Sequence, residues 1–286
     1  MRIFLPLPGN EKMAKALAKH TSGELGQLET RRFPDGESYV RIVSDVSDKN
    51  VDLVCTLANP DAQFLSLIFA ANTARELGAK RVGLIAPYLA YMRQDKRFKD
   101  GEAVSSIHFS KLLSGAFDSL VTIDPHLHRI NSLSDIFSIP AQVQQAAPLL
   151  ADWIGDNVKH PVLVGPDSES EQWVSASAKR IGAPYVVLSK RRHGDRKVEI
   201  AVPQINLCRG RQPVLVDDVI SSGRTMIEAA GKFHELGFKK PICVTVHAIF
   251  ADDSYEQLLK LCDQVVSTDT IAHISNKIPV AGLLVS

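Results

Sequence analysis

The sequence predicts an α/β protein of two tandem domains, each with a mainly parallel sheet flanked by helices. Short apolar runs typical of buried strands, such as residues 51–57 and 82–86, alternate with helix-forming segments such as residues 62–77. Part of the second half also repeats the first half at a constant spacing. At 286 residues, the chain is long enough for two modest domains.

The repeat appears when the second half is shifted over the first by 159 residues (235 − 76). Residues 76–78 and 235–237 then share the sequence Glu-Leu-Gly. This match indicates two copies of one α/β domain, which we expect to occupy residues 1–145 and 146–286.

Local signals mark the elements of the first copy. Asn10 is a typical N-cap residue, and Gly78 is a typical C-cap residue for the helix before it. The Pro34-Asp35-Gly36 sequence favours a turn. We expect strands at residues 3–5, 51–57, 82–86 and 120–123, and an alternating strand that follows the turn within residues 31–42. We expect helices at residues 10–19, 62–77 and 105–113.

The second copy follows the same order. Residues 214–216 form an apolar run typical of a buried parallel strand, and we expect the strand to end at Asp217 and Asp218. A polar loop follows, and a helix-forming run begins at Met226. We also expect strands at residues 162–164, 185–188 and 242–248, and a helix at residues 171–181.

Composition excludes two functional classes. A net charge of +1 argues against a nucleic-acid partner, because no basic surplus exists to neutralise a phosphate backbone. No segment approaches the roughly 18 apolar residues of a membrane span. The amino-terminal apolar stretch is too short for a signal peptide and is interrupted by Pro6 and Pro8. We therefore expect a cytoplasmic protein without membrane contact.

The cysteines point to the same compartment. They lack metal-ligand spacing, and each lies in or near an apolar run, so we expect buried, reduced thiols. They are Cys55, Cys208, Cys243 and Cys262.

Phosphate-binding groups follow the strand expected at residues 214–216. They lie where the carboxyl ends of parallel strands bind ligands. The hydroxyls of Ser221, Ser222 and Thr225 combine with the permissive backbone of Gly223 and the start of the next helix. Together these groups predict a cradle for a phosphate.

Two carboxylates precede this cradle. Asp217 and Asp218 would repel a phosphate, so they suit sugar hydroxyls or a divalent metal ion instead. The alternative is an acid-rich turn that only caps a helix. The complete pattern resembles the loop that binds 5-phosphoribosyl-1-pyrophosphate (PRPP) in the phosphoribosyltransferase fold.

The first copy carries a different set of polar groups. Residues 91–99 contain four cations directly after a predicted strand, which suits a triphosphate, although a solvated surface loop is the alternative. Asp124 and His126 follow another strand and could serve a metal–nucleotide complex, whereas a lone histidine there is more often structural. The segment from Phe33 to Glu37 offers an aromatic face and two acceptors for an adenine, but its central sequence is also a common turn.

Taken together, these segments resemble one family closely, the ribose-phosphate pyrophosphokinases, in a short form without obvious allosteric features. The resemblance covers nearly the whole chain and implies two phosphoribosyltransferase-like domains. It also implies Mg²⁺-dependent transfer of the terminal pyrophosphoryl group of ATP to ribose 5-phosphate, giving PRPP and AMP. The matching segments are FPDGE at 33–37, PYLAYMRQDKR at 87–97, DPH at 124–126, PD at 166–167, KRR at 190–192 and VDDVISSGRT at 216–225.

The resemblance implies a nucleotide-binding role for the first copy. The adenine would contact a segment that a neighbouring subunit often supplies in this family, which implies a homo-oligomer. The residues implied to bind ATP are Phe33, Asp35, Glu37, Arg93, Gln94, Asp95 and Lys96.

The remaining roles follow from the other motifs. The metal ligands would be Asp124, His126 and Asp167, and the charge on the transferring group would be stabilised by Lys190 and Arg192. A positive surface patch is the alternative for those two cations. The residues implied to hold ribose 5-phosphate are Asp217, Asp218, Ser221, Ser222, Gly223, Arg224 and Thr225.

The two copies differ in one respect, and the second copy differs from the family pattern in another. Under the repeat offset, Asp217 falls on Ala58 and Asp218 on Asn59, so the first copy has lost the ribose-phosphate chemistry. Arg224 stands where relatives usually carry a small residue, which leaves its role open.

Two rival functions share part of the pattern. A transferase that consumes PRPP would have the 214–230 segment but no use for the motifs of the first copy. A regulatory subunit without catalysis would keep the fold and lose catalytic side chains, whereas this chain retains Arg93, His126, Asp167, Lys190 and Asp217.

Overall fold

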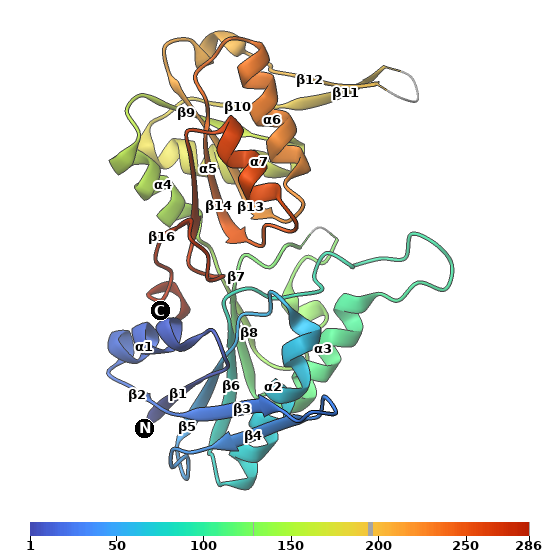
Figure 1. The fold of residues 1–286 in the computed structure, drawn as a ribbon, viewed down its shortest axis with the longest axis vertical. Helices are drawn as coiled ribbons and strands as arrows, with labels where there is room; N and C mark the ends of the chain where they lie inside the picture. Colours follow the sequence, from blue (N-terminus) through green and yellow to red (C-terminus); the bar gives the residue numbers. More distant parts are fainter. Residues whose placement is uncertain (128, 194–196, 286) are drawn as a thin grey trace. The chain divides into compact units, whose positions relative to one another are not determined.

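The computed structural model describes residues 1–127, 129–193 and 197–285, with the backbone alone described at residues 169, 172, 190–193 and 197–201. The chain divides into two compact units (Figure 1). Unit 1 comprises Met1–Gln145, Thr270–Ala272 and the chain from Ala281 onward, and unit 2 comprises Ala146–Asp269 and His273–Val280. The carboxyl-terminal segment therefore contributes to both units.

Unit 1 is built on a six-stranded parallel sheet with the strand order β2-β1-β5-β6-β7-β8. Its strands are apolar along most of their length, because side chains on both faces are buried, as with Leu53 and Leu84 on one face and Phe4 and Ile85 on the other. The elements of the sheet and its connections are β1 (Arg2–Pro6), α1 (Glu11–Thr21), β2 (Glu24–Leu25), β5 (Asn50–Val54), α2 (Pro60–Glu76), β6 (Arg81–Ala86), α3 (Ser105–Ala116), β7 (Ser119–Ile123), η1 (Leu133–Asp135), β8 (Ala141–Gln144) and η4 (Leu283–Val285).

A separate antiparallel hairpin in unit 1 joins β3 (Leu28–Arg32) to β4 (Ser38–Ile42). Its turn is closed by the Phe33 N–H, which donates to the Glu37 carbonyl at 2.8 Å, and by the Gly36 N–H, which donates to the Phe33 carbonyl at 2.9 Å. Gly36 has a φ of 91°, a conformation that favours glycine. The predicted turn is therefore confirmed.

Unit 2 has the same construction, with a six-stranded parallel sheet in the order β10-β9-β13-β14-β15-β16. A two-stranded antiparallel hairpin is inserted after β10. The elements are α4 (Ala147–Asn157), β9 (Pro161–Gly165), η2 (Ser168–Ser170), α5 (Glu171–Ile181), β10 (Tyr185–Val187), β11 (Ser189–His193), β12 (Lys197–Ala201), η3 (Ile205–Cys208), β13 (Gln212–Ile220), α6 (Arg224–Glu235), β14 (Ile242–Ala248), α7 (Ser254–Leu261), β15 (Gln264–Thr268) and β16 (Asn276–Ile278).

The two sheets confirm the predicted fold class. Strands occupy equivalent places when β1, β5, β6 and β7 of unit 1 are matched to β9, β13, β14 and β15 of unit 2. Helix α2 ends at Glu76 and helix α6 ends at Glu235, which reproduces the offset found in the sequence. The internal repeat is therefore a repeat of structure.

The predicted boundaries around the polar loop of unit 2 are wrong. Strand β13 does not end at Asp217 but runs to Ile220, because β14 also continues and pairs Val219 with His247 and Ile220 with Ala248. The two carboxylates are thus part of the strand. Helix α6 begins at Arg224 rather than Met226, so the loop proper is only Ser221–Gly223.

Several elements of unit 2 were absent from the sequence-based expectation, namely α4, the β11–β12 hairpin, α7, β15 and β16. Helix α4 begins beside Pro148, a favourable residue in a first helical turn. Strands β11 and β12 pair antiparallel, with Lys190 opposite Ile200 and Arg192 opposite Val198. The expected strand at residues 185–188 therefore continues, after a break, into a hairpin.

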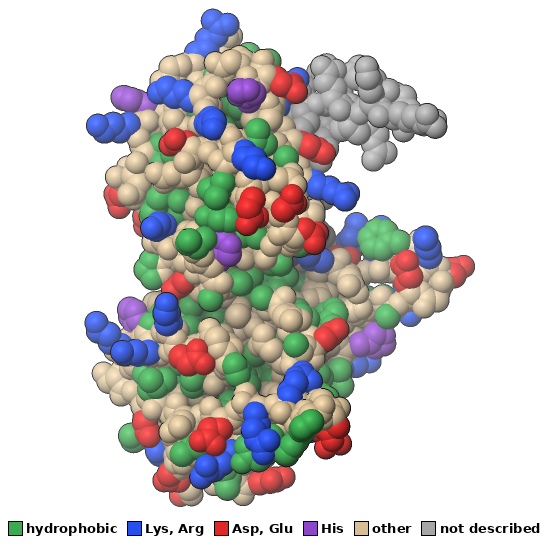
Figure 2. Space-filling model, viewed as in Figure 1, with side chains coloured by type: hydrophobic (Ala, Val, Ile, Leu, Met, Phe, Trp, Pro, Cys, Tyr) green, Lys and Arg blue, Asp and Glu red, His purple; other side chains and the backbone are tan. Residues whose placement is uncertain are grey.

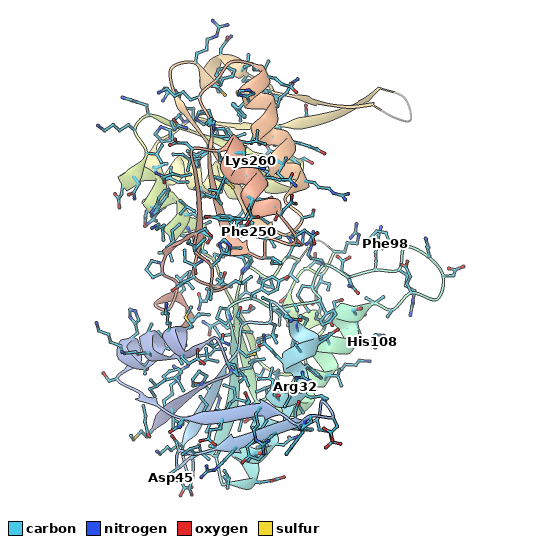
Figure 3. The ribbon with its side chains drawn as sticks, viewed as in Figure 1. Arg32, Asp45, Phe98, His108, Phe250 and Lys260 are labelled. Carbon is cyan, nitrogen blue, oxygen red and sulfur yellow. The ribbon has the colours of Figure 1, made fainter. Side chains whose placement is uncertain are left out.

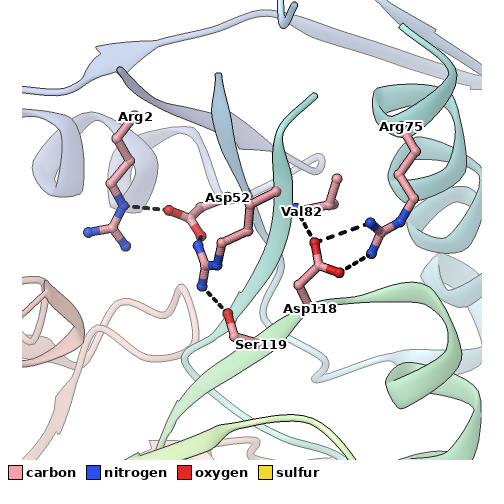
Figure 4. A network of polar contacts seen from close by, with 7 residues as sticks. Arg2, Asp52, Arg75, Val82, Asp118 and Ser119 are labelled. Atoms are coloured by element: carbon pink, nitrogen blue, oxygen red, sulfur yellow. Dashed lines mark hydrogen bonds and ion pairs between the residues drawn. The ribbon is translucent and has the colours of Figure 1, made fainter. Parts of the chain in front are cut away.

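Buried ion pairs tie the strands of unit 1 together (Figure 4). The Asp52 carboxylate in β5 is only 3% exposed and pairs with Arg2 of β1 at 2.5 Å and with Arg81 of β6 at 3.4 Å. Arg81 also donates to the Ser119 hydroxyl of β7. A single buried carboxylate thus connects four adjacent strands, and its two guanidinium partners offset the cost of burying its charge.

The charges on the surface are mixed in sign. In the face shown in Figure 2, Lys and Arg side chains are interspersed with Asp and Glu side chains, in keeping with the net charge of +1. Among the helices that the structure describes, none is long and apolar enough to cross a membrane.

The four cysteines are buried and free, as predicted. Burial raises the pKa of Cys55 to about 12 and the pKa of Cys262 to about 12. These thiols are therefore protonated at neutral pH and behave as small apolar side chains.

We expect substitution of Gly83 in β6 to destabilise the fold, because there is no space for a side chain beside Asp52. A Cβ atom at Gly83 would overlap Asp52 Oδ1, which the two arginines hold in place, so Gly83→Ala should lower the free energy of unfolding by about 1–3 kcal/mol. The control is Gly115→Ala in α3, where a Cβ atom meets nothing within 4 Å and helix propensity should add about 0.5 kcal/mol. Urea denaturation measures both variants, and equal effects would contradict the assignment.

Candidate active site

The polar loop of unit 2 lies between the carboxyl end of β13 and the start of α6. Gly223 is the last residue before the helix and has a φ of 68°, a conformation that favours glycine. A Cβ atom there would also lie 3.0 Å from Ser254 Cβ. Gly223 is therefore required both by its backbone conformation and by close packing.

The backbone of this loop presents a row of hydrogen-bond donors. Within the part of the chain that the structure describes, the N–H groups of Ser222, Gly223, Arg224 and Thr225 have no acceptor. The positive end of the α6 dipole lies at the same place. Such an arrangement can bind a phosphate-sized anion, with the hydroxyls of Ser221, Ser222 and Thr225 close in sequence to the same donors.

In unit 1, the segment directly after β5 is held by its own chain. Asn10 Oδ1 accepts the N–H of Thr56 at 2.7 Å, and the Tyr88 carbonyl accepts the N–H of Leu57 at 3.0 Å. The Thr56 hydroxyl donates to the carbonyl of Thr270 at 2.6 Å. The backbone directly after β5 is therefore held by contacts within unit 1.

Three carboxylates gather at the ligand-binding edge of the unit 2 sheet. Asp217 and Asp218 lie near the end of β13, and Asp167 follows the adjacent strand β9. Loss of solvent is the largest cause that raises the pKa of Asp217 well above its ordinary value, and the negative charges of Asp218 and Asp167 raise it further. A cation or a hydroxyl donor at this edge would relieve that repulsion.

The predicted metal ligands are distributed over the two units. Asp124 and His126 follow β7 in unit 1, whereas Asp167 belongs to unit 2. No group of three or more His, Cys, Asp or Glu residues that could hold a metal ion is found in the described part of the chain. Asp124 has a φ of 37°, a strained conformation of the kind that collects at functional sites.

The cationic loop of unit 1, residues 87–104, connects β6 to α3. The Tyr91 hydroxyl donates to Asp61 in the first turn of α2, and the Tyr91 ring packs on Phe109 with centroids 4.8 Å apart. Gln94 holds the start of α3, because its carbonyl accepts the N–H of Ser106 at 3.3 Å. The loop is therefore attached to two helices.

Asp95 supplies a third attachment of the same loop. Its side chain is 1% exposed and accepts hydrogen bonds from the backbone and the guanidinium of Arg129, at 3.1 and 2.9 Å. Burial raises the pKa of Asp95, but these hydrogen bonds outweigh it and hold the pKa below its ordinary value. Arg129, which no sequence signal distinguished, thus joins the segments that follow β6 and β7.

These attachments leave the cations of the loop at the surface. The exposed side chains are Arg93, Lys96, Arg97 and Lys99. Lys96 Nζ lies 4.6 Å from the ring centroid of Phe98, itself 68% exposed (Figure 3). Such cations can meet a polyphosphate without a large rearrangement of the backbone.

The tip of the β3–β4 hairpin presents an aromatic and two acids. The Arg31 guanidinium lies 4.3 Å from the ring centroid of Phe33 and 4.5 Å from that of Tyr39. Asp35 accepts the N–H of Glu37 at 3.1 Å. Sequence reasoning singled out the aromatic ring and the acids but missed Arg31, because its contact with the ring depends on the cross-strand pairing.

One turn of α2 anchors both the hairpin and the cationic loop of unit 1. Arg32 of the hairpin (Figure 3) donates to the Ala62 carbonyl at 2.7 Å, and Tyr91 of the cationic loop binds the neighbouring Asp61. The hairpin and the loop are therefore held by adjacent residues of the same helix.

The predicted catalytic cations lie in the hairpin of unit 2. The backbones of Lys190 and Arg192 belong to β11. Their side chains lie outside the described residues.

Comparisons with known proteins cover nearly the whole chain. A family model for the N-terminal domain of ribose phosphate pyrophosphokinase matches residues 2–116, and a model for the phosphoribosyl transferase domain matches residues 132–281. The phosphoribosylpyrophosphate synthetase of Mycobacterium smegmatis has a similar structure, with a TM-score of 0.86 at 23% identity over 99% of this chain and 96% of that one. This likeness shows the shared fold.

Curated relatives match this chain over nearly its whole length and over nearly the whole of their own length. The ribose-phosphate pyrophosphokinase of Sulfurisphaera tokodaii is 34% identical over 93% of this chain and 92% of its own. The protein of the same name from Methanopyrus kandleri is 34% identical over 98% of this chain and 96% of its own. With both family models and these relatives in agreement, the chain belongs to the ribose-phosphate pyrophosphokinase family.

Proposed function

We propose that this protein makes PRPP and AMP from ribose 5-phosphate and ATP. The anomeric hydroxyl oxygen of the sugar forms a bond to the β-phosphorus of ATP, the bond from that phosphorus to the α,β-bridging oxygen breaks, AMP leaves, and the hydroxyl proton is released. The observation that carries the proposal is the row of unpartnered N–H donors at the start of α6, beside the carboxylates of β13.

Ribose 5-phosphate is assigned to unit 2. The 5-phosphate would accept hydrogen bonds from the N–H groups and hydroxyls of the 221–225 loop, where the dipole of α6 favours negative charge. Asp217 and Asp218 would accept hydrogen bonds from sugar hydroxyls. Arg224, as the first residue of α6, is exposed and can add a charge-assisted contact to the same phosphate.

ATP is assigned to unit 1. Phe33 offers an aromatic surface for the adenine, and Asp35 and Glu37 offer acceptors for its exocyclic amine. Arg93 and Lys96 are exposed cations suited to the triphosphate, with Gln94 beside them. Asp95 would act indirectly, because its carboxylate is engaged with Arg129 and holds the loop in place.

Magnesium fits the oxygen chemistry of the predicted ligands. Mg²⁺ prefers oxygen ligands and commonly binds through one or two carboxylates together with substrate phosphates. Asp167 beside Asp217 provides such carboxylates in unit 2, and the raised pKa of Asp217 reflects the negative charge that an ion would neutralise. Bound there or with Asp124 and His126, the ion would neutralise phosphate oxygens as charge shifts between them.

The last part of the proposal assigns a role in catalysis to Lys190 and Arg192 of β11. Transfer of a phosphoryl-type group depends mainly on positioning and on neutralising equatorial oxygens, so no nucleophilic side chain is required. Lys190 and Arg192 would provide that neutralisation in the transition state.

Two further properties belong to the same proposal. We expect a homo-oligomer, supported by large apolar side chains exposed on α2 and α3, including Leu65, Phe69 and Leu112. A monomer in sedimentation velocity would contradict the homo-oligomer.

Reduced, buried thiols support a cytoplasmic location, which fluorescence microscopy of the tagged protein tests.

Phosphorus NMR of the purified protein with Mg²⁺, ATP and ribose 5-phosphate tests the function. We expect resonances of AMP and PRPP to appear together, because the pyrophosphoryl group moves as a unit. Production of ADP would indicate an ordinary kinase instead. Binding of ribose 5-phosphate without turnover would favour the regulatory subunit.

Replacing Lys190 should affect the chemical step. Lys190→Ala should lower kcat by about 100-fold or more, because charge stabilisation in the transition state is lost. The control is Lys179→Ala on the exposed last turn of α5. Steady-state kinetics measures both variants, and unchanged turnover in Lys190→Ala would remove this residue from the mechanism.

Replacing Asp217 should weaken substrate binding while stabilising the fold. Asp217→Asn should raise the KM for ribose 5-phosphate about tenfold or more, because charge-assisted hydrogen bonds to the sugar are lost.

Because the pKa of Asp217 is raised by folding, the folded state binds its proton more tightly than the unfolded state. The parent therefore loses stability as the pH rises from the ordinary pKa of an aspartate through the raised value.

Asparagine cannot ionise, so the variant escapes that loss. In buffer with EDTA, urea denaturation should show Asp217→Asn to be more stable than the parent at pH 8 and the difference to shrink at pH 5. A difference that does not change with pH would contradict the raised pKa.

A further inference from the structure

The segment after β14, residues 249–254, packs directly against the start of the 221–225 loop, and we name it the loop seat. The N–H groups of Ile249 and Phe250 both donate to the Ile220 carbonyl, at 3.1 and 3.0 Å. The N–H of Ala251 donates to the Ser221 carbonyl at 3.0 Å. The loop seat therefore binds two successive carbonyl groups at the point where β13 becomes the loop.

Ser254, the last residue of the loop seat and the first of α7, adds a second donor to the same carbonyl. Its hydroxyl donates to the Ser221 carbonyl at 3.2 Å, and the residue is only 2% exposed. Its Cβ atom also lies beside Gly223, where an added Cβ atom would approach it to 3.0 Å. Ser254 thus contacts the loop at two places, one polar and one apolar.

The two hydrogen bonds to Ser221 fix the orientation of one peptide plane. The structure has no cis peptide bond in its described residues, so the Ser221 carbonyl and the Ser222 N–H point in opposite directions. Because the carbonyl points into the loop seat, the Ser222 N–H points away from it. That N–H is one of the donors left without an acceptor in the loop.

A rotation of this peptide plane would reverse the chemistry of the loop. The Ser222 N–H would turn toward the loop seat, and the lone pairs of the Ser221 carbonyl would face the bound anion. A carbonyl oxygen repels a phosphate, whereas an N–H attracts it. The donors of the loop seat therefore determine whether this peptide favours or opposes the anion.

The backbone of the loop seat is strained at two residues and depends on side-chain packing to keep its conformation. Phe250 has a φ of 43° and Asp252 a φ of 54°, values that are costly for residues other than glycine. The Phe250 ring (Figure 3) packs against Tyr255 and His273, with centroids 5.1 and 4.7 Å away. Packing therefore maintains the strained backbone that carries the donors.

We propose that Ser254 is a positioning residue, which orients the Ser221–Ser222 peptide so that the loop binds the phosphate of ribose 5-phosphate. The proposal rests on the assignment of the 221–225 loop to that phosphate. Ser254 acts through Ser221 and does not contact the reacting atoms.

The test compares Ser254→Ala with a matched variant. Removing one hydrogen bond should weaken binding of ribose 5-phosphate about fivefold, seen both as a raised Kd in isothermal titration calorimetry without ATP and as a raised KM. The kcat and the KM for ATP should stay within about twofold. The control is Thr268→Val in β15, which also removes a buried hydroxyl that donates to a backbone carbonyl, that of Val246 at 2.7 Å.

The outcomes separate this proposal from the proposed function. Turnover of the parent protein decides whether PRPP is made, whereas the Kd ratio between Ser254→Ala and the parent decides the role of Ser254. An unchanged Kd would overturn the proposal, and so would an equal change in Thr268→Val. Equal changes in the KM of both substrates would indicate a general structural defect and would overturn it as well. Ser254→Cys, which keeps the side-chain volume but donates weakly, should resemble Ser254→Ala.

Discussion

The parallel pairing of β13 with β14 is the constraint on which the rest of the ligand-binding edge depends. Because the ladder continues to Ile220 and Ala248, both carboxylates of β13 are fixed within a strand rather than left on a loop. The strand then gives way to the helix within three residues, Ser221–Gly223, which leaves the first N–H groups of α6 without partners. The same continuation of β14 carries the chain to the loop seat. One ladder therefore positions the acids, the donors and their support.

The two units share a fold, but their chains are held differently after the equivalent strands β5 and β13. In unit 2 the N–H groups at the start of α6 have no acceptor among the described residues, whereas in unit 1 Asn10 and Tyr88 accept the N–H groups of Thr56 and Leu57 directly after β5. Thr56 of unit 1 also binds the carboxyl-terminal segment through Thr270. The segment after β5 is thus part of the internal scaffold of unit 1, in keeping with the need of buried backbone donors for partners. The polar groups that we assign to ATP lie instead on the hairpin and the cationic loop of unit 1.

Binding chemistry in unit 2 is maintained at the expense of stability. Asp217 carries a charge that burial and neighbouring acids disfavour, and Phe250 holds a strained backbone. Stabilising contacts lie elsewhere, as in unit 1, where the buried Asp52 joins four strands and the loop attachments use Tyr91 and Asp95. Such a division is expected when a site must present unsatisfied groups to its ligand.

The sequence by itself determined the fold class, the internal repeat, the turn at Gly36 and the polar residues of the 221–225 loop. These features depend on local periodicity, on glycine at positive φ and on motifs that are contiguous in the chain. Only the tertiary structure decided where β13 ends, because Val219 and Ile220 are held by partners in β14. It likewise decided that Asp95 is bound by Arg129 and that Ser254 supports Ser221, residues 34 and 33 positions apart. No local pattern encodes such contacts, since they arise only when distant strands are brought to the same edge of a sheet.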